Sequence, residues 1–268
     1  MTDEPVAVET KGEVAYVWDA PEYATDYFLK MTLETLNAGG SVVYSEDSPV
    51  VSARTWYDIN NTADYIYIWN PEGTPNADGS YNWADKNNWD YYKNRVYSGH
   101  NGYPVNSGSN LAYFGPNVKA RVCIDLSSGS PISGNRQLAT IEVKPSAEIE
   151  LFGTTTAYAF TVSSKLDATT LTVGEGLYLV TPVQKGVTIE VKEGGIINPN
   201  AALNDCTINV GEGGTLKTAN ALSLSNAFIN VDAGMVQLTG NNGFAKVLDG
   251  GVTADNGSQL AIKSGLVL

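Results

Sequence analysis

Three short stretches of the sequence share one pattern, and this pattern decides the fold. Residues 188–195 read TIEVKEGG, residues 207–214 read TINVGEGG and residues 228–234 read FINVDAG, so successive copies begin 19 and 21 residues apart. A repeat of about 20 residues is typical of stacked architectures, because so short a copy cannot bury its apolar face alone. The three copies therefore predict a β-solenoid.

Each copy begins with a strand in which apolar and polar residues alternate. Alternate side chains of a strand point to opposite faces, so Ile and Val should point inward and the residue between them outward. The pattern can be aligned along the C-terminal half, with the second inward residue at Ile124, Val143, Val173, Val191, Val210, Val231 and Ala254. The 30-residue gap between Val143 and Val173 predicts an extra strand at 159–162.

A second and a third strand are expected in each repeat. Apolar runs follow the Gly-containing corners at 177–180 and 196–197, and a further run occurs at 222–224. Gly suits such corners because they need positive φ. The sequence thus predicts a mainly β fold, a parallel β-helix with three short strands per repeat of about 20 residues. A right-handed coil is expected from the general preference of parallel crossovers.

The composition changes near residue 118, and this change predicts the domain organisation. All five Trp and 13 of the 15 Tyr residues lie before this position, while short Val, Ile, Leu and Thr runs dominate after it. We expect a loose leader over 1–13, an aromatic-rich capping region over 14–118 and the parallel β-solenoid over 119–268. A cap is needed because the terminal strands of a solenoid expose unpaired backbone groups.

The capping region begins with a segment that has two interpretations. The residues after Asp19 resemble a helix start, and the spacing of apolar residues then favours a helix over 20–37. The alternative is a strand in which Leu29, Met31 and Leu33 share one face. Further strands are predicted at 14–18, 41–44, 50–59 and 64–69.

Residues 69–115 contain spaced Trp, Asn and Gly residues in a distinctive order. The order is Trp-Asn, a Gly-rich turn, Trp, Asn-Trp, Gly-x-Pro, Ser-Gly-Ser-Asn and Ala-x-Phe. It resembles the segment that precedes the β-strand repeats of bacterial autotransporter-type passenger proteins and related secreted surface proteins. The matching residues are Trp69, Asn70, Trp83, Asn88, Trp89, Pro104, Gly108, Ala112 and Phe114. The resemblance implies a following β-solenoid and an extracellular or cell-surface location, and it assigns no catalytic residue.

The charge of the chain argues against two classes of partner. The net charge is −13 and the isoelectric point is near 4.4, so nucleic acid is not expected, because phosphate binding needs clustered Lys and Arg. Anionic membrane surfaces are disfavoured for the same reason. No run of about 18 apolar residues occurs, so no membrane insertion is expected. The acidic start Met1–Pro5 shows no signal-peptide pattern.

The aromatic residues of the capping region are the first candidates for a binding site. Two interpretations stay open for Trp69, Trp83, Trp89 and Tyr103: they stack against the sugar rings of a glycan, or they form the buried core of the cap. His100 is the single histidine and lies in a Gly-His-Asn-Gly turn. No Asp-Asp pair accompanies it, which favours a turn residue over a catalytic one.

One loop has the spacing of a cation site. Asn76, Asp78, Ser80 and Asn82 place oxygen-bearing side chains at alternate positions, as calcium loops do. The Gly lies at the wrong position for an EF-hand and no terminal Glu follows in step, which favours an Asx-type turn. We therefore expect no cofactor, with calcium at this loop as the alternative.

The two cysteines test the strand alignment. Cys206 precedes the inward Ile208 by two residues and should point inward, whereas Cys123 lies between Val122 and Ile124 and should point outward. A disulfide between them is not expected, because the bond requires Cα atoms within about 7 Å.

No nucleophile, nucleotide or zinc-hydrolase motif occurs in the sequence. The sequence therefore predicts a non-enzymatic surface protein: a structural spacer, an adhesin or a surface-layer-type component. The alternatives are a carbohydrate-binding module or a polysaccharide-acting enzyme on the same scaffold. Residues 260–268 still alternate like a strand, so we expect partners to be other copies, end to end or laterally, or surface glycans.

Overall fold

The protein is mainly β in the computed structural model, with one short 3-10 helix, η1 (Lys86–Asn88), among the described residues. The structure describes residues 26–54, 63–94, 96–105, 107–218, 222–238, 252–254 and 259–267. The leader predicted over 1–13 and the strand predicted over 14–18 lie outside these ranges. Within the described ranges, no helix has the length and apolarity needed to cross a membrane.

The chain divides into two compact units, residues 1–60 and residues 61–268. This division falls well before residue 118, where the composition changes. The reason is that the aromatic segment after residue 64 contributes strands to the same sheet as the later repeats.

Unit 1 contains a two-stranded ribbon, which we call the apolar ribbon (residues 26–54). Its strands are β1 (Asp26–Leu29), β2 (Thr32–Leu36), β3 (Val42–Asp47) and β4 (Val51–Arg54). β1 pairs with β4 and β2 with β3, both antiparallel. The turn between β2 and β3 is held by Asn37, whose Oδ1 accepts hydrogen bonds from the backbone N–H groups of Gly39 and Ser41.

The helix predicted over 20–37 is wrong for residues 26–36, which form β1 and β2 with two residues between them, and residues 20–25 lie outside the described part. The alternative, a strand at Leu29, Met31 and Leu33, is correct for Leu29 in β1 and Leu33 in β2, while Met31 lies between the two strands. Two physical factors favour the strand. The segment is rich in Thr and aromatic residues, and the Asn-Ala-Gly-Gly turn brings it against the β-branched residues of β3.

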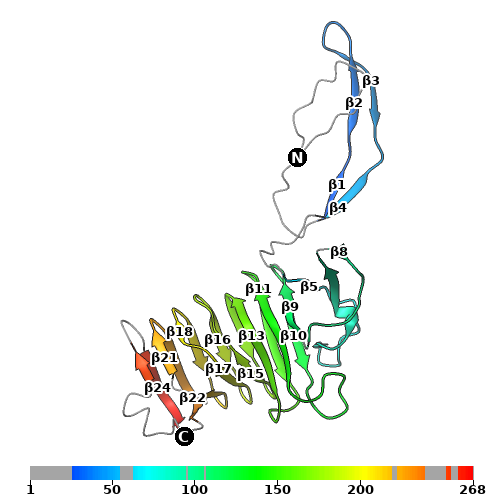
Figure 1. The fold of residues 1–268 in the computed structure, drawn as a ribbon. Coiled ribbons are helices and arrows are strands. Elements are labelled where there is room, and N and C mark those ends of the chain that lie inside the picture. Colours follow the sequence, from blue (N-terminus) through cyan, green and yellow to red (C-terminus); the bar gives the residue numbers. More distant parts are fainter. Residues whose placement is uncertain are drawn as a thin grey trace. The chain divides into compact units, whose positions relative to one another are not determined.

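Unit 2 is built on a 17-stranded, mostly parallel sheet and a separate 3-stranded parallel sheet. Figure 1 shows its strands stacked side by side along one direction, from β5 to β24. The strands are β5 (Tyr65–Trp69), β6 (Tyr81–Asn82), β7 (Trp89–Lys93), β8 (Val96–Tyr97), β9 (Ser107–Phe114), β10 (Lys119–Ile124), β11 (Arg136–Val143), β12 (Glu148–Gly153), β13 (Ala159–Ala168), β14 (Thr170–Val173), β15 (Tyr178–Thr181), β16 (Thr188–Val191), β17 (Ile196–Pro199), β18 (Leu203–Asn204), β19 (Thr207–Val210), β20 (Thr215–Thr218), β21 (Leu222–Ser225), β22 (Phe228–Leu238), β23 (Val252–Ala254) and β24 (Gln259–Val267).

The parallel strands form three ladders and one further set, and in each of them a strand pairs with the strand one repeat later. Ladder A contains β6, β10, β12, β14, β16, β19 and the first halves of β22 and β24. Ladder B contains the first halves of β11 and β13, then β15, β17, β20 and the second half of β22. Ladder C contains β5, β9 and the second halves of β11 and β13, and β18, β21 and β23 form a further parallel set.

Side chains alternate in burial along these strands. In β14, β15, β16, β17, β19 and β20, an exposed or partly exposed residue is followed each time by a buried one. In β16, for example, Ile189 and Val191 are buried in the core while Glu190 faces outward. The predicted inward and outward positions are confirmed in the three copies of the repeat at 188–195, 207–214 and 228–234.

The corners between ladders A and B use left-handed glycine. Gly194 has φ of +68° and Gly213 the same value, as position i+2 of a type II turn requires. The corner Gly194 N–H donates to the carbonyl of Gly213, which lies one repeat later. The corners are therefore hydrogen-bonded in the same direction as the strands.

The predicted strand alignment is wrong at both ends of the repeat region. The strand containing Val122 pairs with the strand containing Leu151, so Val143 does not follow Ile124 in ladder A. Instead, Val143 pairs with Phe114 and Ala168 in ladder C. At the other end, Val231 pairs with Ile262, whereas Ala254 pairs with Leu224. The sequence around Val143, Thr-Ile-Glu-Val, alternates polar and apolar residues as the ladder A strands do, so this pattern alone does not identify the ladder.

Both cysteines are buried, free thiols. Cys206 belongs to the core cluster, which confirms its inward prediction. Cys123 lies outside that cluster, as an outward residue should, but it is only 8% exposed because neighbouring side chains cover it. Burial raises the pKa of each thiol to about 11.

Candidate functional site

The aromatic residues of the predicted capping region form one buried cluster. Trp83 and Trp89 lie 4.8 Å apart, Trp69 and Trp89 lie 4.9 Å apart, and both pairs meet edge to face. Phe114 lies 5.6 Å from Trp89 beneath them. The three Trp residues are at most 4% exposed. In this structure none of the three indoles offers a free ring face to a sugar.

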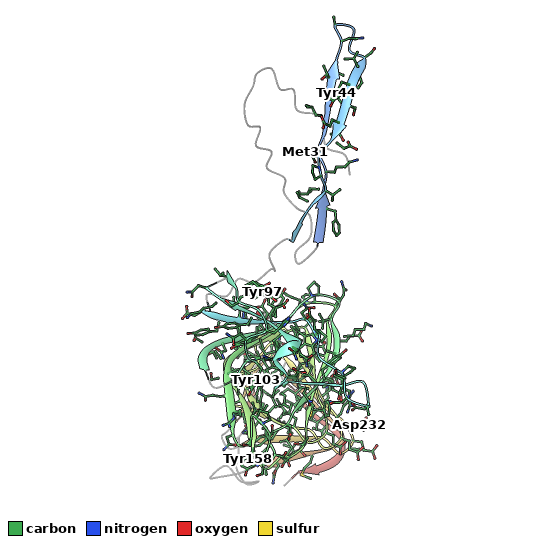
Figure 2. All side chains as sticks on the ribbon, turned by 90° about the vertical axis from the view of Figure 1, so that its right-hand side faces the viewer. Met31, Tyr44, Tyr97, Tyr103, Tyr158 and Asp232 are labelled. Carbon is green, nitrogen blue, oxygen red and sulfur yellow. The ribbon has the colours of Figure 1, made fainter. Side chains whose placement is uncertain are left out.

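Hydrogen bonds fix the orientation of two of these rings. The Nε1–H group of Trp83 donates to the carbonyl of Pro104 at 2.9 Å, and that of Trp89 donates to the carbonyl of Trp83 at 2.8 Å. Tyr103 is half-buried and packs against the same core (Figure 2). The geometry favours the second interpretation in so far as these aromatics are buried in a core that they share with the later strands.

Asn88 shows why the aromatic segment needs Asn as well as Trp. Its Oδ1 accepts from the Gly73 N–H at 3.2 Å, and its Nδ2 donates to the Asn82 carbonyl at 2.9 Å. A Cβ on Gly73 would lie 2.5 Å from that Oδ1, so the two loops meet at van der Waals contact. The fully buried amide of Asn88 thus joins two loops of the cap.

The oxygen atoms of the 76–82 loop are engaged with donors of the protein itself. Asp78 Oδ1 accepts from the backbone N–H and the hydroxyl of Ser80, and its Oδ2 accepts from Arg121 at 2.8 Å. The hydrogen bonds from Ser80 are the main cause that lowers the pKa of Asp78. The Nδ2 group of Asn76 donates to the Ser80 hydroxyl. Asp78 therefore binds the Arg121 guanidinium through one oxygen and Ser80 through the other. The contacts with Ser80 are typical of an Asx-type turn.

Metal ligands do not gather in the described part of the chain, where no group of three or more His, Cys, Asp or Glu residues has the geometry to hold an ion. His100 instead bridges two loops. Its Nδ1 lies 3.0 Å from the carbonyl of Trp89, and its Nε2 lies 3.3 Å from Oε2 of Glu72.

A groove of about 260 Å³ opens at the corner between ladder C and ladder A, and we call it the corner notch. Its origin is a missing turn. The corners before and after it are four-residue turns, in which Ala147 N–H donates to the Lys144 carbonyl and Val187 N–H to the Gln184 carbonyl. Between them β13 ends at Ala168 and β14 begins at Thr170, leaving a single corner residue. The lining residues are Glu142, Val143, Lys144, Pro145, Asp167, Ala168, Thr169, Lys185 and Gly186.

Opposite charges alternate around the corner notch. Lys144 Nζ lies 3.0 Å from a Glu142 carboxylate oxygen, and Lys185 Nζ lies 3.0 Å from Asp205. Glu142 and Asp167 are partners in the parallel ladder, so their carboxylates stack one repeat apart. Burial raises the pKa of Glu142, and the neighbouring Lys144 only partly opposes this.

Sequence reasoning missed the corner notch. A usable signal exists, since the run from 166 to 173 passes from one strand to the next without Gly, Pro or Asn. The strand predicted at 159–162 instead continues to Ala168 as β13, and β14 follows after Thr169 alone.

The apolar ribbon of unit 1 is the largest exposed apolar feature among the described residues. Leu29 lies opposite Val51 and Tyr44 opposite Thr35, and Figure 2 shows Met31 and Tyr44 projecting from the ribbon. Between 41% and 74% of each large apolar residue is exposed: Phe28, Leu29, Met31, Leu33, Leu36, Val42, Val43, Tyr44, Val50 and Val51. A two-stranded ribbon of this kind is at best marginally stable without a covering layer.

Comparisons with known proteins add no relative to this description. A scan against protein families, a search of the curated proteins and a search of the solved structures each found no match.

Proposed function

We propose that this protein is a non-enzymatic, extracellular or cell-surface β-solenoid that serves as a structural spacer or adhesin. The observation that carries the proposal is the one-repeat register of ladder A, in which Ile189 pairs with Ile208 and Ile208 with Ile229. Parallel strands usually return through a helix. Here two further short strands make the return, which supports a parallel β-helix with three strands per turn and, by the general crossover preference, a right-handed coil.

Such a coil is suited to span distance. Its backbone hydrogen bonds run along the long axis, and each turn adds about 4.8 Å. The buried Trp cluster covers the first turns, and a surface with a net charge of −13 opposes nonspecific sticking. The Trp-Asn segment before the repeats supports the same assignment through its resemblance to secreted bacterial surface proteins.

The apolar ribbon is the part of this spacer that we assign to contact with other copies of the chain. Its exposed apolar residues and its lack of a covering layer among the described residues support this role.

Two measurements on the full chain test the proposal. An antibody against the purified protein should label intact cells of the source organism, and brief protease treatment of the cells should remove the label. The purified protein should release no reducing ends and no unsaturated products from neutral or acidic polysaccharides. Labelling only after cell lysis would refute the surface assignment, and turnover of a polysaccharide would refute the non-enzymatic one.

Carbohydrate binding is the second candidate function. The observation that favours it is the corner notch, where acceptors and donors alternate within one groove.

A further inference from the structure

We propose that the corner notch is a binding subsite for one sugar unit of a neutral polysaccharide. The site lies on the repeats and not among the aromatic residues of the cap. It goes beyond the spacer function, because a spacer needs no ligand of its own.

The notch is a feature of one corner and not of the repeat. Thr169 alone makes the turn where its neighbours use the segments 144–147 and 184–187. Residues 144–145 and 185–186 of these two turns line the notch, together with Ala168 and the exposed Thr169, which we call its floor. Strands two repeats apart are separated by about 9.6 Å, twice the ordinary spacing. A sugar ring bound at this corner would lie between the two turns.

The groups around the notch match the chemistry of a sugar diol. Each sugar hydroxyl donates one hydrogen bond and accepts others. The Glu142 and Asp167 carboxylates accept, and the Lys144 and Lys185 ammonium groups donate, so adjacent hydroxyls can bind to both kinds at once. Pro145 adds an apolar wall for the C–H face of the ring. A groove of about 260 Å³ is smaller than the usual pocket for a drug-sized ligand, which also indicates one ring.

Charge selects a neutral ligand over an acidic one. Lys144 is paired with Glu142, Lys165 with Asp167 and Lys185 with Asp205, so the ammonium charges at the notch are already balanced. The surrounding molecule has a net charge of −13 and repels polyanions. A bound uronate would therefore meet no unbalanced positive charge.

The test is isothermal titration of the full chain with cellohexaose, laminarihexaose and mannohexaose, and with a hexamer of galacturonate as the acidic probe. We expect at least one neutral hexamer to bind and the galacturonate hexamer not to bind. Binding of the acidic probe alone, or of none of the four, would overturn the inference.

Variants then locate the site. Thr169→Trp places a large side chain on the exposed floor and should abolish binding, while Glu212→Trp at an exposed corner between ladders A and B is the matched control and should bind normally. Glu142→Gln and Lys185→Met, which leave the floor intact, should each weaken binding about tenfold, as expected for a lost hydrogen bond to a charged group. Circular dichroism checks that each variant is folded.

Unchanged binding by Thr169→Trp, or equal loss in the Glu212→Trp control, would place the ligand elsewhere and refute the site. Release of reducing ends from a bound hexamer would refute the non-enzymatic function while leaving the notch as the binding site. Failure of the binding-site proposal is therefore seen in the titrations, whereas failure of the non-enzymatic function is seen in the release of reducing ends.

Discussion

Glu150 connects more charged side chains than any other carboxylate described on ladder A. Arg121 Nε lies 3.0 Å from its Oε1, and Lys192 Nζ lies 2.6 Å from its Oε2. Arg121 also binds Asp78 and lies 4.2 Å from the centre of the Phe152 ring. One carboxylate thus links the first loop of the cap to a corner of the central repeats.

Replacing Glu150 by Gln should lower the free energy of unfolding at pH 7 by about 1 kcal/mol, the upper range for a partly exposed ion pair. Burial alone would raise the pKa of Glu150, but the bonds from Lys192 and Arg121 outweigh it and lower the pKa below its ordinary 4.5. The stabilisation is therefore present above pH 4.5 and is lost as the pH falls through the folded pKa. Urea denaturation at pH 7 and pH 3 measures both effects.

Glu148, two residues earlier on the same strand, is the control for Glu150. It pairs with Lys119, and both side chains are largely exposed. Glu148→Gln should therefore leave the unfolding midpoint nearly unchanged. Equal losses for the two variants would show that the position of Glu150 at the centre of the network has no special role.

Gly194 gives a second prediction for a single residue. Its φ of +68° is in the left-handed region, so Gly194→Ala should cost about 1 kcal/mol in unfolding free energy. Gly211 begins the next corner turn, and a Cβ there meets only ordinary contact at 3.5 Å. Gly211→Ala should therefore be neutral or slightly stabilising. Thermal unfolding of the two variants measures this difference in stability. A larger loss of stability in Gly211→Ala than in Gly194→Ala would contradict the prediction.

Among the elements, the strands of the central repeats could be predicted from sequence, because burial imposes alternation on them. Ile189, Ile208 and Ile229 stack as their pattern indicates. The ladder to which Val143 belongs could not be predicted, because corner turns vary in length from four residues to one. The corner notch exists only because of such a variation, so the same missing turn that obscured the alignment also concealed the site.

The ribbon strand β2 was predicted only as the alternative to a helix, for a different reason. Residues 20–37 satisfy helical spacing and strand alternation equally well, since apolar residues fall at both periods. The deciding interaction is pairing with β3, which lies beyond the Asn37 turn. Local pattern therefore left the choice open, and a contact distant in sequence settled it.

The cap yields a prediction on the scale of an element. Trp83→Phe removes the buried hydrogen bond to the Pro104 carbonyl and leaves that oxygen without its donor, at a cost of about 1–3 kcal/mol. The variant should shift the denaturant midpoint downward when unfolding is followed by Trp fluorescence. Tyr97→Phe changes an exposed ring of strand β8 and should shift it by less than about 0.5 kcal/mol. Equal shifts would mean that the Trp83 bond does not hold the cap.

For the whole molecule, two features act in opposite directions. A net charge of −13 makes copies of the chain repel one another, while the apolar ribbon favours burial against another surface. Salt weakens the charge repulsion between copies far more than it changes the apolar attraction of the ribbon. The Debye length falls from about 10 Å at 0.1 M to about 3 Å at 1 M, so repulsion is largely removed at high salt.

We therefore expect the full chain to be monomeric at low salt and to associate as the salt concentration rises, as light scattering after size-exclusion chromatography would show. Leu33→Ser should remain monomeric at every salt concentration, because it removes an exposed apolar residue of the ribbon. Glu34→Ser, the adjacent residue on the opposite face, should associate at least as readily as the natural chain, since it removes a negative charge. A monomer at all salt concentrations, or equal association of Leu33→Ser and the natural chain, would show that the ribbon does not bind a second copy.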